Sequence, residues 1–245
     1  MLLPRVMHHE KLKISDSESV LSWQATIALF AELKMAQNMV SLPFVFEHVV
    51  TPIVLAGGRS KRMGRDKALL ELDGIPLLTR TCNLALTVSN VVYVVSSRDY
   101  LRVIPEGCDR IDDRVLNGPL YAFAEALNQI GDKLQTNWIL LLSCDLPYLD
   151  SETINQWILQ LDQVPDNAIA YLAKNQAGFS EVLCGFYRIE CKSSLIEYVN
   201  QGGRSFQQWL RSKVVEELVW DDRRVFFNCN TPEDWQNASS KPSIF

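Results

Sequence analysis

The sequence predicts an α/β domain of three layers, in which helices cover both faces of a mostly parallel sheet. From residue 51 onward, short apolar runs alternate with longer segments whose apolar residues recur at helical spacing. The run 91–95 is apolar on both faces, as an interior strand of a parallel sheet should be. Parallel strands need crossover connections, which the intervening helices supply. Ligands of such sheets bind at the carboxyl ends of the strands, so the loops after residues 56, 95, 113 and 143 are the places to search.

The apolar pattern assigns each element to a stretch of chain. Strands are expected at 53–56, 91–95 and 138–142, and the last is the most apolar run of the sequence. A helix over 76–89 begins at Pro76, which suits a first turn. A helix over 154–161 has Asp150 or Ser151 as its N-cap. Further strands are expected at 168–172, 182–187, 214–220 and 225–227, and further helices at 120–130, 192–200, 206–210 and from 231 onward.

The chain of 245 residues is long enough for one large domain, expected over 51–238 and followed by a tail over 239–245. Residues 1–50 differ from the rest. Apolar residues near helical spacing make 17–38 a candidate amphipathic helix. Two explanations of this stretch stay open: an N-terminal extension of uncertain order, and an upstream start with translation beginning near Met39.

Composition and charge narrow the class of protein. The net charge of −5 argues against a general nucleic-acid binder, which would carry a clustered basic surplus. Six scattered cysteines form no C-x-x-C pair and no zinc-ligand pattern, which predicts reduced thiols in a cytoplasmic protein. No apolar run reaches the length of a membrane span, and the N-terminus lacks a signal-peptide layout. All three histidines precede residue 51, so a histidine-based catalytic centre is not expected.

A glycine loop follows the first predicted strand. The run 53–56 ends in Gly57–Gly58, where backbone N–H groups can approach an anion closely because no Cβ stands in the way. Cations after such a turn add charge-assisted hydrogen bonds to phosphate. The loop therefore predicts a polyphosphate cradle, and the alternative is a surface loop solvated by its own charges. The cations are Arg59, Lys61, Arg62, Arg65 and Lys67.

Two aspartates follow later strands. Asp145 comes directly after the apolar run 138–142, where it would be held rigidly as a hard oxygen ligand for Mg²⁺; the alternative is that it caps a turn before Pro147. Its neighbour Cys144 is expected to be a small buried residue. Asp113 precedes the turn at Gly118, where a carboxylate can accept hydrogen bonds from the ring N–H and exocyclic amine of a base. Guanine offers this donor pair.

Several strings in the chain resemble one family. Leu55-Ala-Gly-Gly-x-Ser-x-Arg-Met-Gly-x-Asp-Lys67 closely resembles the opening signature of the MobA-like nucleotidyltransferases, and its Ala-Gly-Gly form is similar to the molybdenum cofactor guanylyltransferase branch. Cys144-Asp-Leu-Pro147 resembles the family motif C-D-x-P, and Asp113 fits the aspartate before G-P-L-x-G. Asn228-Cys-Asn-Thr-Pro-Glu-Asp234 matches the closing motif N-x-N-T-P-E-D. The resemblance covers residues 52 to about 235.

The resemblance implies a fold, a reaction and its reactants. The fold is the three-layer, Rossmann-like nucleotidyltransferase fold. The reaction is transfer of GMP from GTP to molybdopterin with release of pyrophosphate, which forms the molybdopterin guanine dinucleotide cofactor. Mg²⁺ is the expected cofactor. Proteins that deliver molybdopterin or mature molybdoenzymes are candidate partners, whereas nucleic acid and membranes are not expected.

The resemblance also implies the site residues. Lys67, Arg62 and Asp145 are expected to be catalytic, and Asp145 to hold the metal. Arg204, Asn228 and Asn230 are candidates for the pterin side. The residues expected to bind GTP are Leu55, Ala56, Gly57, Gly58, Lys67, Asp113 and Asp145.

Three positions depart from the family pattern. Val95 stands where some relatives have an asparagine that contacts the nucleotide, Ala122 stands where a glycine is frequent, and Val182 replaces a proline. These departures leave two other readings open: cytidylyl or other nucleotidyl transfer to a different phosphorylated acceptor, and a non-catalytic relative that only binds nucleotide.

Overall fold

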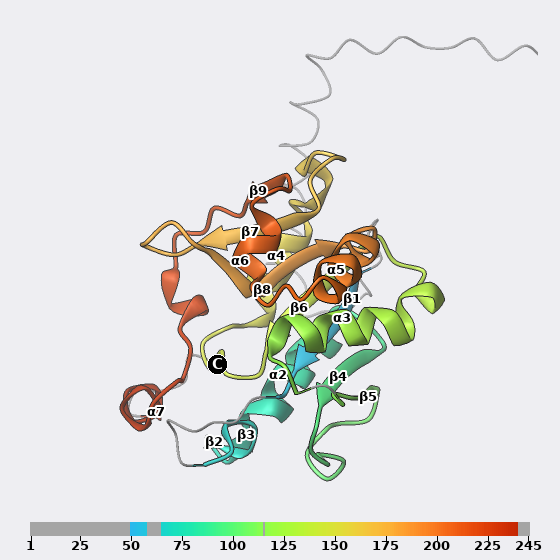
Figure 1. Ribbon diagram of the computed structural model, residues 1–245. Helices are drawn as coiled ribbons and strands as arrows, with labels where there is room; N and C mark the ends of the chain where they lie inside the picture. Colours follow the sequence, from blue (N-terminus) through green and yellow to red (C-terminus); the bar gives the residue numbers. More distant parts are fainter. Residues whose placement is uncertain (1–49, 58–64, 115, 240–245) are drawn as a thin grey trace, which may run out of the picture. The chain divides into compact units, whose positions relative to one another are not determined.

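The computed structural model describes residues 50–57, 65–114 and 116–239 (Figure 1). The predicted extension over 1–50 and tail over 239–245 lie almost wholly outside these ranges, so the predicted domain boundaries stay predictions. Among the described residues, no helix is both long and apolar enough to cross a membrane.

The described part of the chain contains a seven-stranded sheet with the order β5-β4-β1-β6-β8-β7-β9. β8 runs antiparallel to both of its neighbours, β6 and β7, and every other pair in the sheet is parallel. The mostly parallel sheet predicted from the sequence is thereby confirmed. The strands are β1 (Val50–Leu55), β4 (Val92–Ser96), β5 (Cys108–Asp112), β6 (Trp138–Ser143), β7 (Ala170–Lys174), β8 (Ser180–Arg188) and β9 (Val215–Glu217).

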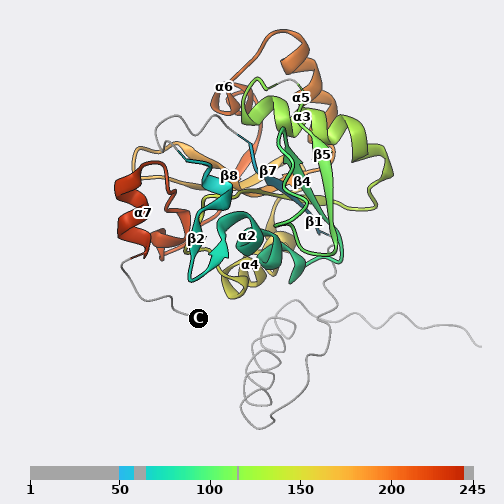
Figure 2. The same ribbon diagram turned by 90° about the horizontal axis from the view of Figure 1, so that it is seen from below.

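Helices cover both faces of this sheet, as Figure 2 shows. Alternate side chains of the central strand β6 point to opposite faces: Leu140 and Leu142 belong to one core cluster, and Ile139 and Leu141 to the other. These two cores give the three layers that the sequence predicts. The first core contains residues of α2 (Leu77–Leu86) and α4 (Ser151–Ile158), and the second contains residues of α3 (Pro119–Ile130), α5 (Cys191–Asn200) and α6 (Phe206–Leu210).

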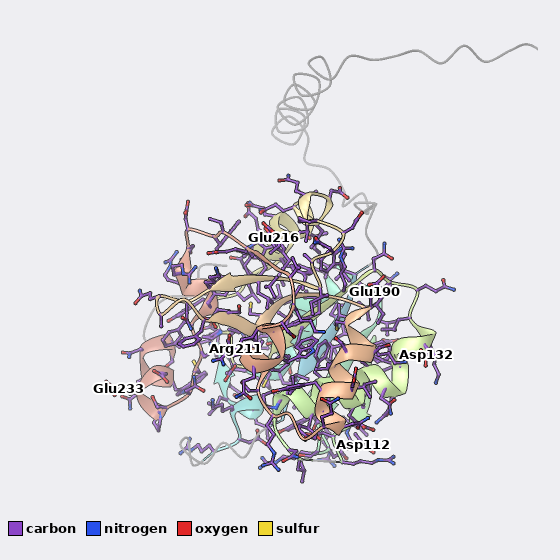
Figure 3. All side chains as sticks on the ribbon, turned by 45° about the horizontal axis from the view of Figure 1, so that its top comes forward. Asp112, Asp132, Glu190, Arg211, Glu216 and Glu233 are labelled. Atoms are coloured by element: carbon purple, nitrogen blue, oxygen red, sulfur yellow. The ribbon has the colours of Figure 1, made fainter. Side chains whose placement is uncertain are left out.

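Many charged side chains lie on the outside of the domain, among them Asp132, Glu190 and Arg211 (Figure 3). Trp157 of α4 and Trp209 of α6 instead pack inward, and Trp157 stacks on Phe226 with ring centroids 5.5 Å apart. Burial of such large aromatic surfaces stabilises the packing of helices on the sheet.

Local sequence signals place several helix starts. Asp150 caps α4, because its carboxylate accepts a hydrogen bond from the Thr153 N–H at 2.7 Å, as predicted. Helix α2 begins one residue later than expected, at Leu77, so Pro76 is its N-cap and not its first residue. Pro76 also ends the short strand β3 (Ile75–Pro76), which pairs with β2 (Glu71–Leu72). The last helix, α7 (Pro232–Ser239), follows Thr231, whose hydroxyl accepts a hydrogen bond from the Asp234 N–H at 3.1 Å.

One predicted strand was wrong, and one strand of the seven-stranded sheet was not predicted. Residues 225–227 do not form a strand: they fall in or next to the 3₁₀ turn η4 (Arg223–Phe226), which the Asp222 side chain caps by accepting from the Arg224 N–H. The sequence pattern also gave no sign of β5, since Ile111 is its one buried residue. The other 3₁₀ turns are η1 (Lys67–Leu69), η2 (Gly131–Lys133) and η3 (Leu161–Gln163).

The strand order reverses at β1, which lies between β4 and β6. The chain continues from β1 to β4 and β5 on one side, and then crosses to β6 on the other. Backbone hydrogen bonds hold the strand ends together here: the Ala56 N–H donates to Val95 at 2.9 Å, and the Cys144 N–H donates to Leu55 at 3.3 Å. In open α/β sheets such a reversal is where ligands bind.

Candidate active site

Lys67 connects three distant segments at this edge of the sheet. Its ammonium nitrogen lies 3.1 Å from Oδ2 of Asp145, which follows β6, and 2.8 Å from Oδ1 of Asn230, which precedes α7. The side chains of Lys67 and Asp145 are 17% and 13% exposed, so solvent screens the ion pair only in part. The ammonium is therefore fixed in direction while it remains within reach of a ligand.

Asp145 is oriented from both sides. The Ser143 hydroxyl donates to Oδ1 of Asp145, and the Cys229 N–H donates to the Asp145 backbone carbonyl at 3.0 Å. Within the described residues, the carboxylate accepts hydrogen bonds from side chains and from no backbone N–H of the turn before Pro147. The described contacts therefore do not support the alternative that Asp145 is a turn cap.

Asp113 and Gly57 lie next to each other where β5 and β1 end. Asp113 is buried, and its Oδ1 accepts from the Leu116 N–H at 3.1 Å. A Cβ added to Gly57 would stand 3.6 Å from Oδ2 of Asp113, so the glycine backbone lies next to the second carboxylate oxygen. Leu116 makes this hydrogen bond in a left-handed backbone conformation, with a φ of 52°. This conformation is rare for a residue with a bulky side chain.

The two cysteines near this cluster are neutral thiols. Burial, aided by the Asp145 and Asp66 carboxylates, raises the pKa of Cys144 well above its ordinary range. Burial also raises the pKa of Cys229 to about 12, and the charge of Asp145 adds to the effect. Since the thiolate is the reactive form, neither is a nucleophile. The expectation that Cys144 is a small buried residue is confirmed.

The sequence of this chain is similar to those of known proteins. Residues 52–216 match the model of the "MobA-like NTP transferase domain". The chain belongs to the MobA-like nucleotidyltransferase family. It is 46% identical over 187 residues to the "Probable molybdenum cofactor guanylyltransferase" of Trichormus variabilis, which covers 76% of this chain and 88% of the relative. It is 40% identical over 189 residues to the protein of that name in Synechococcus elongatus, across 75% of this chain and 95% of the relative.

Solved structures share the fold. Molybdopterin-guanine dinucleotide biosynthesis protein A from Archaeoglobus fulgidus superposes with a TM-score of 0.61 at 20% identity, over 78% of this chain and 97% of that one. The 4-diphosphocytidyl-2C-methyl-D-erythritol synthase of Anaerococcus prevotii gives 0.59 at 12% identity, over 82% and 98%. The MobA-like resemblance read from the sequence, and the nucleotidyltransferase fold it implies, are confirmed.

The structure brings together part of the expected MobA-like site. Lys67, Asp145 and Asn230 form one cluster, with Gly57 next to Asp113. The sequence assigned Asn230 to the pterin side and gave no sign of its contact with Lys67. Leu55 and Ala56 are buried, which leaves them only backbone groups to offer. Gly58 and Arg62 lie outside the described residues.

The side chains of the other two pterin-side candidates form no hydrogen bond with Lys67, Asp145 or Asn230 among the described residues. Arg204 is exposed and makes no hydrogen bond or ion pair with any described residue. The amide of Asn228 donates to the Phe226 carbonyl at 3.0 Å. Their assignment to the pterin side stays a prediction.

The departures from the family pattern fall in well-packed places. Val95 and Ala122 are 1% and 5% exposed and belong to the second core cluster, so their side chains pack against the sheet. Val182 is half-buried in β8. The residue after Val95, Ser96, is fully buried, and its hydroxyl accepts from the Arg98 N–H at 2.9 Å. The Ser96 side chain therefore stabilises the loop that follows β4.

The donor set suits Mg²⁺ held jointly with a substrate. No group of three or more His, Cys, Asp or Glu side chains is placed to hold a metal within the described ranges. Asp145 offers a rigid carboxylate at the edge of the sheet where ligands bind. Mg²⁺ characteristically binds through one or two carboxylates together with substrate phosphates and water. A single carboxylate therefore fits this ion, whereas an all-protein cage is not formed.

Proposed function

We propose that this protein transfers GMP from GTP to molybdopterin and releases pyrophosphate, forming the molybdopterin guanine dinucleotide cofactor. The observation that carries the proposal is its 46% identity to the "Probable molybdenum cofactor guanylyltransferase" of Trichormus variabilis across 88% of that protein. The cluster of Lys67, Asp145 and Asn230, where the strand order reverses, supports the proposal. It offers a cation that can neutralise phosphate charge and a carboxylate that can bind a metal ion.

The reaction is a substitution at phosphorus. An oxygen of the molybdopterin phosphate attacks the α-phosphorus of GTP, a new P–O bond forms, and the bond between the α-phosphorus and the bridging oxygen breaks as pyrophosphate leaves. A phosphate monoester is already anionic near neutral pH, so no strong general base is needed. Catalysis then rests on positioning and on neutralisation of charge.

Lys67 supplies a cation to the triphosphate and the departing pyrophosphate. Its ammonium is already directed by Asp145 and Asn230, so little reorganisation is needed when phosphate oxygens arrive. We assign Arg62 to the same charge. Backbone groups of Gly57 and Gly58 would approach the nucleotide, and Asp113 would accept hydrogen bonds from N1–H and N2–H₂ of guanine.

Asp145 would hold Mg²⁺, and the ion would neutralise charge on the triphosphate. Ser143 keeps the carboxylate in position for this role by donating to Oδ1. A cytoplasmic location, and partner proteins that supply molybdopterin or receive the product, stay predictions.

The test is nucleotide choice. The purified protein is incubated with molybdopterin, Mg²⁺ and GTP or CTP, and the products are identified by mass spectrometry. We expect the guanine dinucleotide from GTP and no product from CTP. A cytosine dinucleotide would replace the proposal by cytidylyl transfer. Binding of GTP–Mg²⁺ that raises the melting temperature, without product from either nucleotide, would indicate a non-catalytic relative.

A further inference from the structure

Asp66 precedes Lys67 and shapes its turn. Asp66 is the N-cap of η1 (Lys67–Leu69), and its Oδ1 accepts a hydrogen bond from the Ala68 N–H at 3.2 Å. Its backbone carbonyl accepts from the Leu69 N–H at 3.2 Å. Ala68 is 2% exposed and belongs to the first core cluster, so it anchors the turn in the interior. The backbone of Lys67 is thereby fixed between a cap and an anchor.

The second oxygen of Asp66 is bound from another loop. Oδ2 accepts a hydrogen bond from the Tyr100 hydroxyl at 2.8 Å and forms a short ion pair with the Arg98 guanidinium. Tyr100 is 6% exposed and lies in the same core cluster. Ser96 fixes the start of this loop at the end of β4 through two hydrogen bonds with the backbone of Arg98. The loop after β4 therefore holds Asp66 with two donors.

This arrangement borders the Lys67 cluster directly. Lys67 follows Asp66 in the chain, and its ammonium reaches Asp145 at the end of β6. Cys144 packs in the same core as Tyr100 and Ala68. The electrostatic neighbours of Cys144 include Asp145, Asp66 and Lys67. Residues that follow β4 therefore bind Asp66, and a residue that follows β6 binds its neighbour Lys67.

We propose that Asp66 is a positioning residue for Lys67 and that Tyr100 and Arg98 hold it in place. In this inference, which rests on the proposed function, the capped turn sets the direction of Lys67, and Asp145 and Asn230 receive its ammonium. The segment after β4 contributes through Asp66 rather than through a side chain at Val95.

Tyr100→Phe tests the proposal with a small change. It removes the hydroxyl that donates to Asp66 and keeps the ring that fills the core. We expect kcat for GMP transfer to fall by about 10-fold or more, since small misplacements of a reacting group have large effects on rate. The KM for GTP should change little, because the other nucleotide contacts remain. Asp66→Asn should lower kcat in the same way, since it loses the charge that Arg98 binds.

Tyr171→Phe is the matched control. Tyr171 is 5% exposed, lies in the same core cluster, and donates one hydroxyl hydrogen bond of 2.7 Å, to Gln160 rather than to Asp66. We expect this variant to lose as much thermal stability as Tyr100→Phe and to keep the wild-type kcat. An equal loss of kcat in both variants would overturn the proposal, because the effect would then be structural.

A second readout does not depend on transfer. The rate at which an amine-reactive ester acylates Lys67 is followed by mass spectrometry, with the exposed Lys133 as internal reference. We expect the rate at Lys67 to rise several-fold in Tyr100→Phe and Asp66→Asn and to stay constant in Tyr171→Phe. Unchanged labelling in the first two variants would overturn the positioning role. Absence of transfer by the wild type would instead overturn the proposed function, and the labelling rates would still decide the role of Asp66.

Discussion

At the scale of single residues, Lys67 concentrates the chemistry. Its ammonium is shared between the Asp145 carboxylate, 78 positions further along the chain, and the Asn230 amide oxygen, 163 positions further along. Lys67→Ala should lower the rate of GMP transfer by on the order of 10²-fold or more, because charge on the departing pyrophosphate loses its partner. Single-turnover assays with saturating GTP measure this effect on chemistry.

Lys192→Ala provides the control for this prediction. Lys192 also forms an ion pair, with its ammonium nitrogen 2.6 Å from Asp132, but on the outside of the domain. Its loss should leave turnover unchanged, since Asp132 precedes β6 and Lys192 follows β8, which places the pair at the opposite end of β6 from Asp145. Wild-type turnover by Lys67→Ala would remove Lys67 from the mechanism.

Leu116 carries a backbone conformation that glycine would adopt more easily. Its φ of 52° costs about 1–2 kcal/mol for an L-residue, and its side chain is exposed. Leu116→Gly relieves this strain, which stabilises the folded domain. The greater entropy of the unfolded chain opposes this gain by about 0.4–1 kcal/mol. The melting temperature should therefore rise by roughly 1–3 °C, measured by calorimetry.

The same substitution at Leu159 separates strain from loss of side chain. Leu159 is 56% exposed, close to the 58% of Leu116, but it has a helical φ of −62° at the end of α4. Leu159→Gly should lower the melting temperature, because no strain is relieved. A decrease of similar size in both variants would show that Leu116 is not strained.

At the scale of elements, the cap of α7 fixes Asn230 next to Lys67. The Asp234 carboxylate accepts from the backbone N–H groups of Asn230 at 2.9 Å and Thr231 at 2.8 Å, while the Thr231 hydroxyl accepts from the Asp234 N–H at 3.1 Å. Slight burial raises the pKa of Asp234, but these hydrogen bonds outweigh it and lower the pKa below its ordinary value. The motif is a reciprocal capping box.

This cap predicts how stability depends on pH. A folded-state pKa below the unfolded one means that Asp234 stabilises the domain above the unfolded pKa and loses this effect as pH falls through the folded one. Asp234→Ala should lower the free energy of unfolding by about 1 kcal/mol at neutral pH. The difference from the wild type should shrink in acid, below the ordinary pKa of 3.8. Urea denaturation at both pH values measures it, and a difference that grows in acid would contradict the assignment.

The sequence predicts elements well where one signal dominates. The apolar run 138–142 and the cap at Asp150 both appear where expected. β5 was not predicted, because an edge strand that buries Ile111 alone has no apolar pattern to detect. The segment 225–227 was misread because its aromatic residues favour strands, while Asp222 caps a 3₁₀ turn that the pattern does not show.

At the scale of the whole molecule, topology explains how the site could be located and why its contacts could not. The rule that ligands bind at the carboxyl ends of parallel strands predicts that Asp113 and Asp145 follow strands ending at one edge. It does not predict which side chains touch. Lys67 and Asn230 are 163 positions apart, and their contact depends on how the segment after η4 returns to the sheet. The role of Asp66 likewise depends on the loop after β4.

The central claim is that the α-phosphate of GTP moves to molybdopterin. The most direct measurement uses GTP radiolabelled at the α- or the γ-phosphate, incubated with the protein, Mg²⁺ and molybdopterin. We predict that the α-label enters the dinucleotide in equal amount to the γ-label released as pyrophosphate, and that neither moves without molybdopterin. Release of the γ-label as orthophosphate, or an α-label that ends in free GMP, would contradict the account.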